Sequence, residues 1–319
     1  MHCFVCGNND DKRSICKSCL TKELTHDILT CESCGTSFLY PLPSVAELNE
    51  FYGNTYYDFD KNKDEHGGGI FAKKLKRISK TGNFLDIGCS TGHFLKGIKD
   101  KSDWQVFGTE FSGNAVKYAK EKLELDVRQG DLKESGFTEN YFDYIHMNNV
   151  LEHVTDPVLF LKEIFRVLKP KGTFELLVPN GEADVALLKR YFEEEKTPAK
   201  SKDGHIFFFS KKALLNMLEQ TGFKIIKTKT CSVSRGLRVA GYLPLKKNWK
   251  EAYRLTEESG KEKKDFSPRE PKKHSGAYYS YRYFMNNSKN LPGLHSFGLD
   301  FLIVAGKSRS ADAQQKVRR

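Results

Sequence analysis

The chain lacks a run of apolar residues long enough to cross a bilayer, and it does not begin like a secreted protein. A membrane-spanning helix needs about 20 consecutive apolar residues, and no run approaching that length occurs in the 319 residues. The first residues, Met1 to Cys6, contain neither a charged segment nor an apolar stretch of the kind found in secretory signals. These absences argue against a transmembrane helix and a leader, so we expect a cytoplasmic protein.

Net positive charge is absent from the first 230 residues, although the whole chain carries +11. Residues 231–319 contain 19 Lys and Arg against 8 Asp and Glu, which accounts for the entire excess. A field of one sign attracts an anionic partner, such as a phosphorylated or nucleotide-linked substrate, an acidic lipid surface or a nucleic acid. The alternative is a solvated loop and tail that serve only solubility.

Cysteine is scarce after residue 34, where only Cys89 and Cys231 occur, and is concentrated before it in three Cys-x-x-Cys pairs: Cys3 with Cys6, Cys16 with Cys19, and Cys31 with Cys34. In a reducing compartment this spacing favours a metal over disulfides. Four thiolates make a closed, structural tetrahedral Zn²⁺ site. The spacing leaves open which pairs bind, whether the middle pair completes a second cluster with His2 or His26, and whether the thiols are simply free.

Between residues 83 and 230, short apolar runs alternate with helical patterns. This alternation is typical of βαβ units and of a mainly parallel sheet, so we expect an α/β fold with a Rossmann-like, doubly wound sheet. Ser44 and Glu47 have capping-box spacing and predict a short helix to about Phe51, and Gly67–Gly69 is expected to form a hinge. Strands are expected at residues 84–87, 105–109, 126–129, 142–147, 173–178, 223–230 and 299–305, and helices beginning near residues 91, 112, 156 and 210.

Composition divides the chain into six expected segments. They are a cysteine-rich zinc-binding module (1–43), a helical linker or lid (44–82), the Rossmann-like core (83–230), a basic substrate-side insertion (231–296), a final core strand (297–306) and a disordered basic tail (307–319). The first segment has too few apolar residues to fold without a staple. An aromatic cluster that includes Tyr56 and Tyr57 could lie over a cofactor or form part of an interdomain core.

The strongest motif is a glycine-rich turn that follows the first expected core strand. Its spacing is Asp86-x-Gly88-x-x-x-Gly92, which differs from the Gly-x-Gly-x-x-Gly of dinucleotide sites. Glycines let the backbone turn tightly and approach a ligand, whereas the acid argues against a pyrophosphate and favours a ligand with a positive end. The methionine part of S-adenosylmethionine (SAM) carries an ammonium and a sulfonium, so the motif favours SAM.

Two more acids end the next two expected strands. Glu110 occupies the position from which a carboxylate accepts hydrogen bonds from both ribose hydroxyls in doubly wound sheets. Asp131 follows the third strand and is placed to receive an adenine amino group. Ligands bind at the carboxyl ends of the strands in such sheets, so three acids in order predict a nucleoside site. Another Rossmann-like nucleotide binder is the alternative interpretation.

These motifs make residues 83–230 and the last strand resemble the class I SAM-dependent methyltransferases, as do residues 141–145, 149–154 and 167–172. The resemblance implies an antiparallel last strand, and it implies a role for each site residue: Asp86, Gly88, Gly92 and Asn148 near the methionine end, Glu110 on the ribose, and Asp131 with Leu132 beside the adenine. Ser90 departs from the pattern, because relatives usually have a third glycine there. The N-terminus resembles that of bacterial small-molecule and sugar methyltransferases with a zinc knuckle, which implies Cys3, Cys6, Cys31 and Cys34 as ligands.

Methyl transfer from a sulfonium needs the nucleophile aligned about 3 Å from the methyl group and, for a hydroxyl, a base that removes its proton. Two histidines are candidates for that base, His153 and His205, which the resemblance places near the substrate mouth. Glu152 is the third candidate. Each has a structural alternative, namely a histidine bonded to the backbone or a carboxylate that caps a helix.

We therefore expect a SAM-dependent methyltransferase that acts on oxygen, with carbon or nitrogen as alternatives, of a small anionic or carrier-linked acceptor such as a sugar or a quinone or lipid precursor. No Asn/Asp-Pro-Pro-aromatic run follows the fourth strand and no Pro-Cys pair is present, so the family's nucleobase-methylating signatures are missing. One rival is an RNA methyltransferase that grips its substrate through the knuckle and the basic region. Another is a non-catalytic SAM-binding interaction protein. The oligomeric state is left open.

Overall fold

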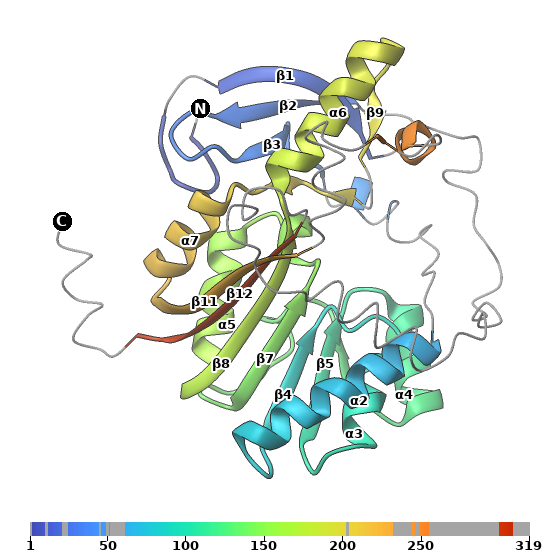
Figure 1. Ribbon diagram of the computed structural model, residues 1–319, viewed down its shortest axis with the longest axis vertical. Helices are drawn as coiled ribbons and strands as arrows, with labels where there is room; N and C mark the ends of the chain where they lie inside the picture. The colour runs from blue at the N-terminus through green and yellow to red at the C-terminus, as the bar shows by residue number, and fades with distance from the viewer. Residues whose placement is uncertain are drawn as a thin grey trace.

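The computed structural model describes residues 2–9, 12–20, 25–44, 46–48, 51, 61–201, 204–231, 244–245, 249–254 and 300–308. Most of the expected basic insertion (231–296), nearly all of the expected tail (307–319), and Tyr56 and Tyr57 lie outside these residues. The described residues form two sheets, a large one and a smaller one (Figure 1).

The large sheet has seven strands in the order β11-β12-β8-β7-β4-β5-β6. Their bounds are β4 (Asn83–Ile87), β5 (Gln105–Glu110), β6 (Asp126–Gln129), β7 (Phe142–Asn148), β8 (Leu168–Pro179), β11 (Phe223–Cys231) and β12 (Asp300–Lys307). The neighbours from β6 to β8 pair in parallel, whereas β12 pairs antiparallel with both β8 and β11. This confirms the predicted Rossmann-like sheet with an antiparallel last strand.

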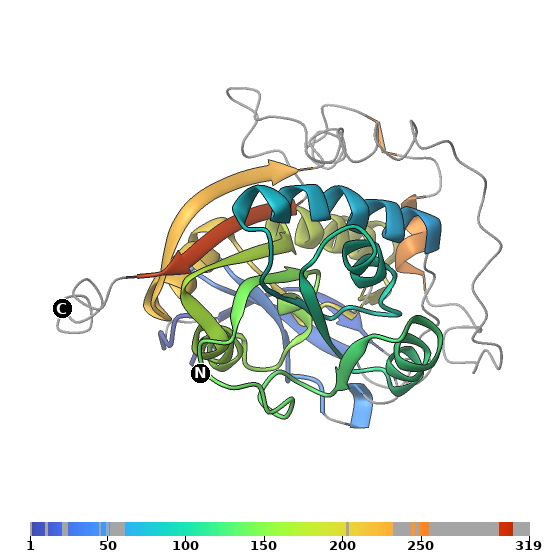
Figure 2. The same ribbon diagram turned by 90° about the horizontal axis from the view of Figure 1, so that it is seen from below.

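Helices cover both faces of the large sheet because its strands are apolar on both sides. Side chains of α2 (Lys61–Ile78), α3 (His93–Lys99) and α4 (Gly113–Leu123) cluster with Phe84, and Figure 2 shows α2 running along that face. Side chains of α5 (Pro157–Val167) and α7 (Lys211–Gln220) cluster with the next residue, Leu85, on the opposite face. The two-residue period of a strand explains this division. None of the described helices has the length and apolar character needed to cross a membrane.

Helix starts predicted from the sequence coincide with side-chain caps, except at α3, which begins at His93 after Gly92 without one. Ser112, Asp156 and Ser210 each accept a hydrogen bond from the backbone amide three residues further along. In the capping box, Ser44 N–H donates to Glu47 Oε2 at 2.9 Å and Glu47 N–H donates to Ser44 Oγ at 3.2 Å. Residues 46–48 are helical, so the local signals place these helix starts correctly.

Gly67–Gly69 lies inside α2 rather than in a hinge before it, which corrects the sequence prediction. The reason is the close approach of α2 to α3. A Cβ atom on Gly68 would lie 2.1 Å from the Phe94 carbonyl oxygen, and one on Gly97 would lie 2.1 Å from the Glu65 carbonyl oxygen. Close packing of the two helices therefore requires glycine here, even though glycine disfavours a helix by about 1 kcal/mol.

The small sheet has the order β10-β3-β2-β1-β9 and joins two distant parts of the chain. The strands β1 (Lys12–Cys19), β2 (Thr25–Cys31) and β3 (Ser37–Tyr40) form an antiparallel meander. The outer strands β9 (Ala199–Lys200) and β10 (Phe207–Phe208) come from the segment after α6 (Gly181–Glu195). Figure 1 shows the small sheet beyond the ends toward which β4 and β7 point, and the sequence predicted neither α6 nor these outer strands.

Candidate functional site

A sharp turn joins β4 to α3 at the carboxyl edge of the large sheet. Gly88, Ser90 and Gly92 all have positive φ, at 71°, 51° and 81°. A Cβ atom on Gly88 would also lie 2.4 Å from Val150 Cγ2. The positive φ values at Gly88 and Gly92 therefore favour glycine. At Gly88 there is also no room for a side chain beside Val150. Ser90, the departure from the family pattern, adopts the left-handed conformation at a cost of about 1 kcal/mol.

Asp86 and Glu110 are the buried acids at this edge, with 5% and 7% of their surface exposed. Glu110 accepts hydrogen bonds from the backbone amides of Ser90 and Ser112, both at 2.9 Å. It thus ties the β4–α3 turn to the start of α4. The Nδ1 atom of His146, on β7, lies 2.7 Å from Asp86 Oδ1. Sequence reasoning missed His146, whose partnership with Asp86 arises only from the pairing of β4 with β7.

The remaining residues predicted to contact the cofactor lie at the same edge, because β4 to β7 run in parallel. Leu132 is fully buried. Asp131 is exposed, and its Oδ1 accepts a hydrogen bond from the Glu134 amide at 2.8 Å. Asn148 is the exposed last residue of β7. The acidic tips, the turn and the buried leucine could hold a nucleoside with a cationic end, but which group each side chain contacts stays a prediction.

The three predicted base candidates, although distant in sequence, meet at one point. The short 3₁₀ helix η1 (Leu151–His153) is held to the segment that leads into β10, because Ile206 N–H donates to the Glu152 carbonyl at 2.8 Å. The rings of His153 and His205 lie 5.1 Å apart. Glu152 Oε1 lies 3.7 Å from His153 Nε2 and 3.8 Å from His205 Nε2. We call these three residues the Glu-His-His cluster.

Burial dominates the electrostatics of the Glu-His-His cluster. Glu152 is 1% exposed, and within the described part of the chain neither of its carboxylate oxygens has a hydrogen-bond partner. Desolvation raises the pKa of Glu152 to about 7, against the attraction of His205. Desolvation and the neighbouring His205 lower the pKa of His153 to about 3, so its ring is neutral near pH 7.

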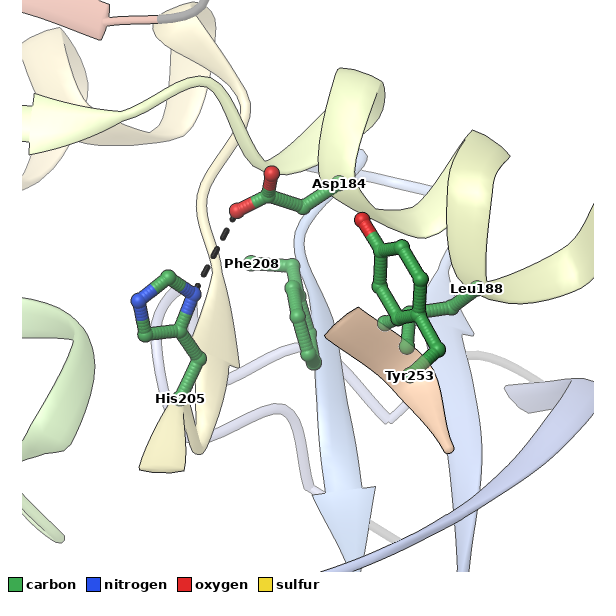
Figure 3. A pocket seen from close by; sticks show the side chains of 5 residues that line it. All are labelled: Asp184, Leu188, His205, Phe208 and Tyr253. Atoms are coloured by element: carbon green, nitrogen blue, oxygen red, sulfur yellow. Dashed lines mark ion pairs between the residues drawn. The ribbon is translucent and has the colours of Figure 1, made fainter. Parts of the chain in front are cut away.

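Asp184, on α6, completes the surroundings of His205 and was missed by sequence reasoning. Its Oδ2 lies 3.3 Å from His205 Nδ1, as the dashed line in Figure 3 shows. The two side chains line a pocket together with Leu188, Phe208 and Tyr253. No local signal pointed to Asp184, because its role depends on α6 packing beside the small sheet.

Four of the six N-terminal thiols converge. The Sγ atoms of Cys3, Cys6, Cys31 and Cys34 all lie within 4.8 Å of one another, and no residue of this set is exposed. The Cys3–Cys34 and Cys6–Cys31 distances are 3.8 Å and 3.7 Å. Sulfurs placed about 2.3 Å from a tetrahedral Zn²⁺ are about 3.8 Å apart. The four thiols therefore fit a tetrahedral metal ion, and they are the set implied by the resemblance.

The middle pair lies apart from this set. Cys16 and Cys19 are buried on β1, and desolvation raises their pKa values to about 12 and about 11. His26 Nδ1 donates to the Pro41 carbonyl at 2.8 Å, and His2 Nδ1 to the Gly7 carbonyl at 3.1 Å. Among the described residues, no second metal-binding cluster forms from Cys16 and Cys19 with either histidine.

Comparison with known proteins places the chain in a family. Residues 64–228, more than half of the chain, match the family described as methyltransferase domain. The chain belongs to the methyltransferase domain family. The match includes the glycine-rich turn, the three acids and the Glu-His-His cluster, and it ends within β11.

Individual relatives of this methyltransferase-family chain are distant. It is 31% identical over 170 residues to an uncharacterized protein of Methanocaldococcus jannaschii, covering 53% of this chain and 77% of that protein. It is 33% identical over 107 residues to a demethylmenaquinone methyltransferase of Listeria monocytogenes, covering 31% of this chain and 45% of that enzyme. The chain thus spans less than half the length of that enzyme. A crystal structure of a SAM-dependent methyltransferase from Archaeoglobus fulgidus aligns with a TM-score of 0.44 and 19% identity, covering 75% of this chain and 94% of the other.

Proposed function

We propose that this protein is a SAM-dependent methyltransferase that methylates an oxygen of a small anionic or carrier-linked acceptor, such as a sugar or a quinone or lipid precursor. The observation that carries the proposal is the pair of buried carboxylates, Asp86 and Glu110, at adjacent strand tips beside a turn of positive-φ residues. Membership of the methyltransferase domain family supports it. The local similarity to demethylmenaquinone methyltransferases supports a quinone-like acceptor within this class. Carbon and nitrogen are the alternative target atoms.

The chain offers a matching group to each part of SAM. The Asp86 carboxylate complements the ammonium and sulfonium of the methionine end. The carboxylate of Glu110, although it already accepts two amide hydrogen bonds, has lone pairs left for ribose hydroxyls. Leu132 gives the adenine an apolar wall and Asp131 an acceptor for its amino group. When bound, SAM supplies an electrophilic methyl group, and these side chains fix its position.

Proton removal falls to the Glu-His-His cluster in this proposal. Val150 packs on Gly88 of the turn, and Glu152 follows two residues later, so the cluster lies beside the cofactor loop. His153 Nδ1 donates to the Gly204 carbonyl at 3.1 Å, which leaves Nε2 as the basic atom of that ring. Glu152, whose pKa burial raises to about 7, is the stronger base of the cluster. The acceptor O–H loses its proton, an O–CH₃ bond forms and the S–CH₃ bond breaks. The products are the methyl ether, S-adenosylhomocysteine and one proton.

We also propose that Cys3, Cys6, Cys31 and Cys34 hold a structural Zn²⁺. The thiol distances and burial support this assignment. An all-thiolate site is closed to substrate, so the ion would have a structural role. It would cross-link the N-terminal loop, which carries Cys3 and Cys6, to the end of β2, where Cys31 lies. This assignment would place the chain among the methyltransferases with an N-terminal zinc knuckle.

Calorimetric titration with SAM and S-adenosylhomocysteine tests the cofactor assignment. Wild-type protein is expected to bind both. Asp86→Asn and Glu110→Gln are expected to weaken binding roughly 10-fold to 100-fold, which is about 1.4–2.8 kcal/mol. Asp126→Asn is the matched control, because this exposed carboxylate lies at the start of β6, the opposite end of the strand from the site. Absence of binding by wild type, or equal affinity in all four proteins, would refute the assignment.

A methyl-transfer screen with labelled SAM then separates the functions that share this cofactor. Turnover with nucleotide sugars or quinols supports the proposal. Turnover with RNA, together with binding that weakens steeply as salt rises, identifies an RNA methyltransferase instead. Cofactor binding without turnover on any acceptor would favour a non-catalytic interaction protein.

A further inference from the structure

The Glu-His-His cluster has the composition of a metal site as well as that of an acid–base group. We infer that Glu152, His153 and His205 together bind one divalent transition-metal ion, separate from the ion held by the four cysteines. One ligand atom from each residue lies within 4.8 Å of the others. Two imidazole nitrogens and one carboxylate are a ligand set that proteins use for Fe²⁺, Zn²⁺ and related ions.

The groups that face the Nδ1 atoms of the two histidines have the arrangement usual around metal-binding histidines. His153 Nδ1 faces the Gly204 carbonyl at 3.1 Å, and His205 Nδ1 faces the Asp184 carboxylate at 3.3 Å. The Gly204 carbonyl can only accept a hydrogen bond and Asp184 pairs with His205 as a carboxylate, so we expect each ring to carry its proton on Nδ1 and to direct Nε2 toward Glu152. Metal-binding histidines are usually oriented in this way, with the second nitrogen bonded to a carboxylate or a backbone carbonyl.

Glu152 is the strongest argument for an ion, because two imidazole nitrogens converge at its buried carboxylate. The side chain is 1% exposed, and among the described residues its two oxygens accept no hydrogen bond. Burying an ionised carboxylate without a partner costs several kcal/mol. A cation between Glu152 and the two Nε2 atoms would remove that cost.

The distances favour an ion over a shared proton. The Nε2 atoms of His153 and His205 lie 3.7 Å and 3.8 Å from Glu152 Oε1. A hydrogen bond would bring these atoms to about 2.7–3.2 Å. Ligands about 2.1 Å from a tetrahedral ion are about 3.4 Å apart, so a small inward movement of each side chain would complete the site.

The charge balance of the Glu-His-His cluster is also suitable for a divalent ion. A divalent ion with one carboxylate and two neutral imidazoles carries one excess positive charge, which the nearby Asp184 carboxylate balances. His205 and Asp184 line the pocket in Figure 3, so the carboxylate that would balance this charge lies on the Nδ1 side of the His205 ring. Three protein ligands leave at least one coordination position for an acceptor oxygen. With the ion bound, the ion would promote loss of the acceptor proton in place of the ligated side chains. This last role, unlike the binding itself, rests on the proposed function.

Titration of the metal-free full-length protein with Co²⁺ tests the inference. Wild type is expected to bind two Co²⁺ per chain, one with the thiolate charge-transfer absorption of a cysteine site and one with visible ligand-field bands only. Glu152→Gln and His205→Gln, which keep similar side-chain volume, are each expected to bind one and to lose only the second spectrum. His66→Gln, a histidine on α2 outside the cluster, is the matched control and is expected to bind two.

Two results would overturn the inference: a single Co²⁺ in wild type, or a second Co²⁺ that persists in both Glu152→Gln and His205→Gln. Calorimetry with S-adenosylhomocysteine on the same preparations reports whether each variant is folded. It also separates the two ideas. Cofactor binding without a second ion refutes the metal site and leaves the proposed function standing, whereas a second ion without cofactor binding does the reverse.

Discussion

The large sheet is enclosed by apolar side chains on both faces, whereas the small sheet encloses many thiols and hydroxyls. In β4 the neighbours Phe84 and Leu85 are both 0% exposed, each in a different apolar cluster. In and around the small sheet, Ser18, Cys31 and Thr36 are 0% exposed as well, and they share the interior with apolar residues such as Ile28 and Phe38. Burial of apolar surface stabilises by about 25 cal/mol per Å², a gain that polar groups do not provide. We therefore expect the large sheet to be stable by itself and the small sheet to depend on an ion.

Removal of metal should give the largest effect and should show most clearly whether the two sheets differ in their dependence on an ion. Chelation of the proposed cysteine-bound ion is expected to destabilise the small sheet by several kcal/mol, since structural Zn²⁺ contributes about 10–16 kcal/mol in isolated zinc-finger peptides. Hydrogen exchange followed by mass spectrometry should show loss of protection at residues 12–40 and 199–208. Protection at residues 105–129, in the large sheet, should remain.

A matched pair of cysteine variants assigns that effect to the four converging thiols. Cys31→Ser removes a ligand from the proposed set and should reproduce the loss of protection. Cys16→Ala removes a buried thiol outside the set and should cost only about 1 kcal/mol, the cost of a small cavity. Equal effects of the two variants, measured by thermal unfolding, would contradict the assignment.

The next effect concerns the large sheet, where helix packing rather than metal sets stability. Gly68→Ala would place a Cβ atom 2.1 Å from the Phe94 carbonyl oxygen, so α2 must move away from α3. Such overpacking is expected to destabilise by about 1–3 kcal/mol. At the neighbouring Gly69, the Cβ atom would lie 3.6 Å from Lys101 Cγ, an ordinary contact. Gly69→Ala should therefore stabilise by up to about 1 kcal/mol, because alanine favours a helix.

Denaturant unfolding of the two glycine variants measures this difference directly. The change in the free energy of unfolding should have opposite signs at these adjacent positions. Gly68→Ala should be less stable than wild type and Gly69→Ala more stable. A loss of similar size in both would mean that the three glycines are required for flexibility. That outcome would restore the hinge that the sequence predicted.

The same two regions differ in how far the sequence predicts them. The strands of the large sheet follow from local apolar runs, and helix starts follow from caps such as Ser112 and Asp156, because each signal lies within a few residues of its effect. The carboxylates at the strand tips also follow, since a parallel sheet brings the ends of its strands to one edge. The hinge predicted at Gly67–Gly69 was wrong. The close contact that requires glycine at position 68 is made with α3, which lies some 30 residues away in the sequence.

The small sheet and the surroundings of the Glu-His-His cluster depend on contacts between distant segments. β9 has two residues, and it is a strand only because β1 pairs with it. Asp184 matters only because α6 brings it to His205, and His146 only because β7 pairs with β4. The sequence contains His153, Glu152 and His205 as separate candidates, but their convergence within one cluster is a tertiary fact. No periodicity or spacing rule contains that information.

The smallest expected effect lies at the proposed cofactor turn, where Ser90 stands in place of the glycine that the resemblance implies. Ser90 has φ of 51°, a conformation that glycine adopts without strain. Ser90→Gly should relieve about 1 kcal/mol of strain, of which the greater freedom of glycine in the unfolded chain offsets a part. The backbone amide that donates to Glu110 is retained, so the turn keeps its tie to the next strand. We expect a small gain in stability and cofactor binding at least as tight as in wild type.

Lys196→Gly is the control for this variant, because Lys196 has φ of 55° at the end of α6, outside the turn. Both variants should unfold at slightly higher denaturant concentration than wild type, but only Ser90→Gly should alter the affinity for S-adenosylhomocysteine. If Ser90→Gly weakens binding while Lys196→Gly does not, the serine side chain itself serves the site. In that case the departure from the family pattern is an adaptation of this chain rather than a tolerated strain.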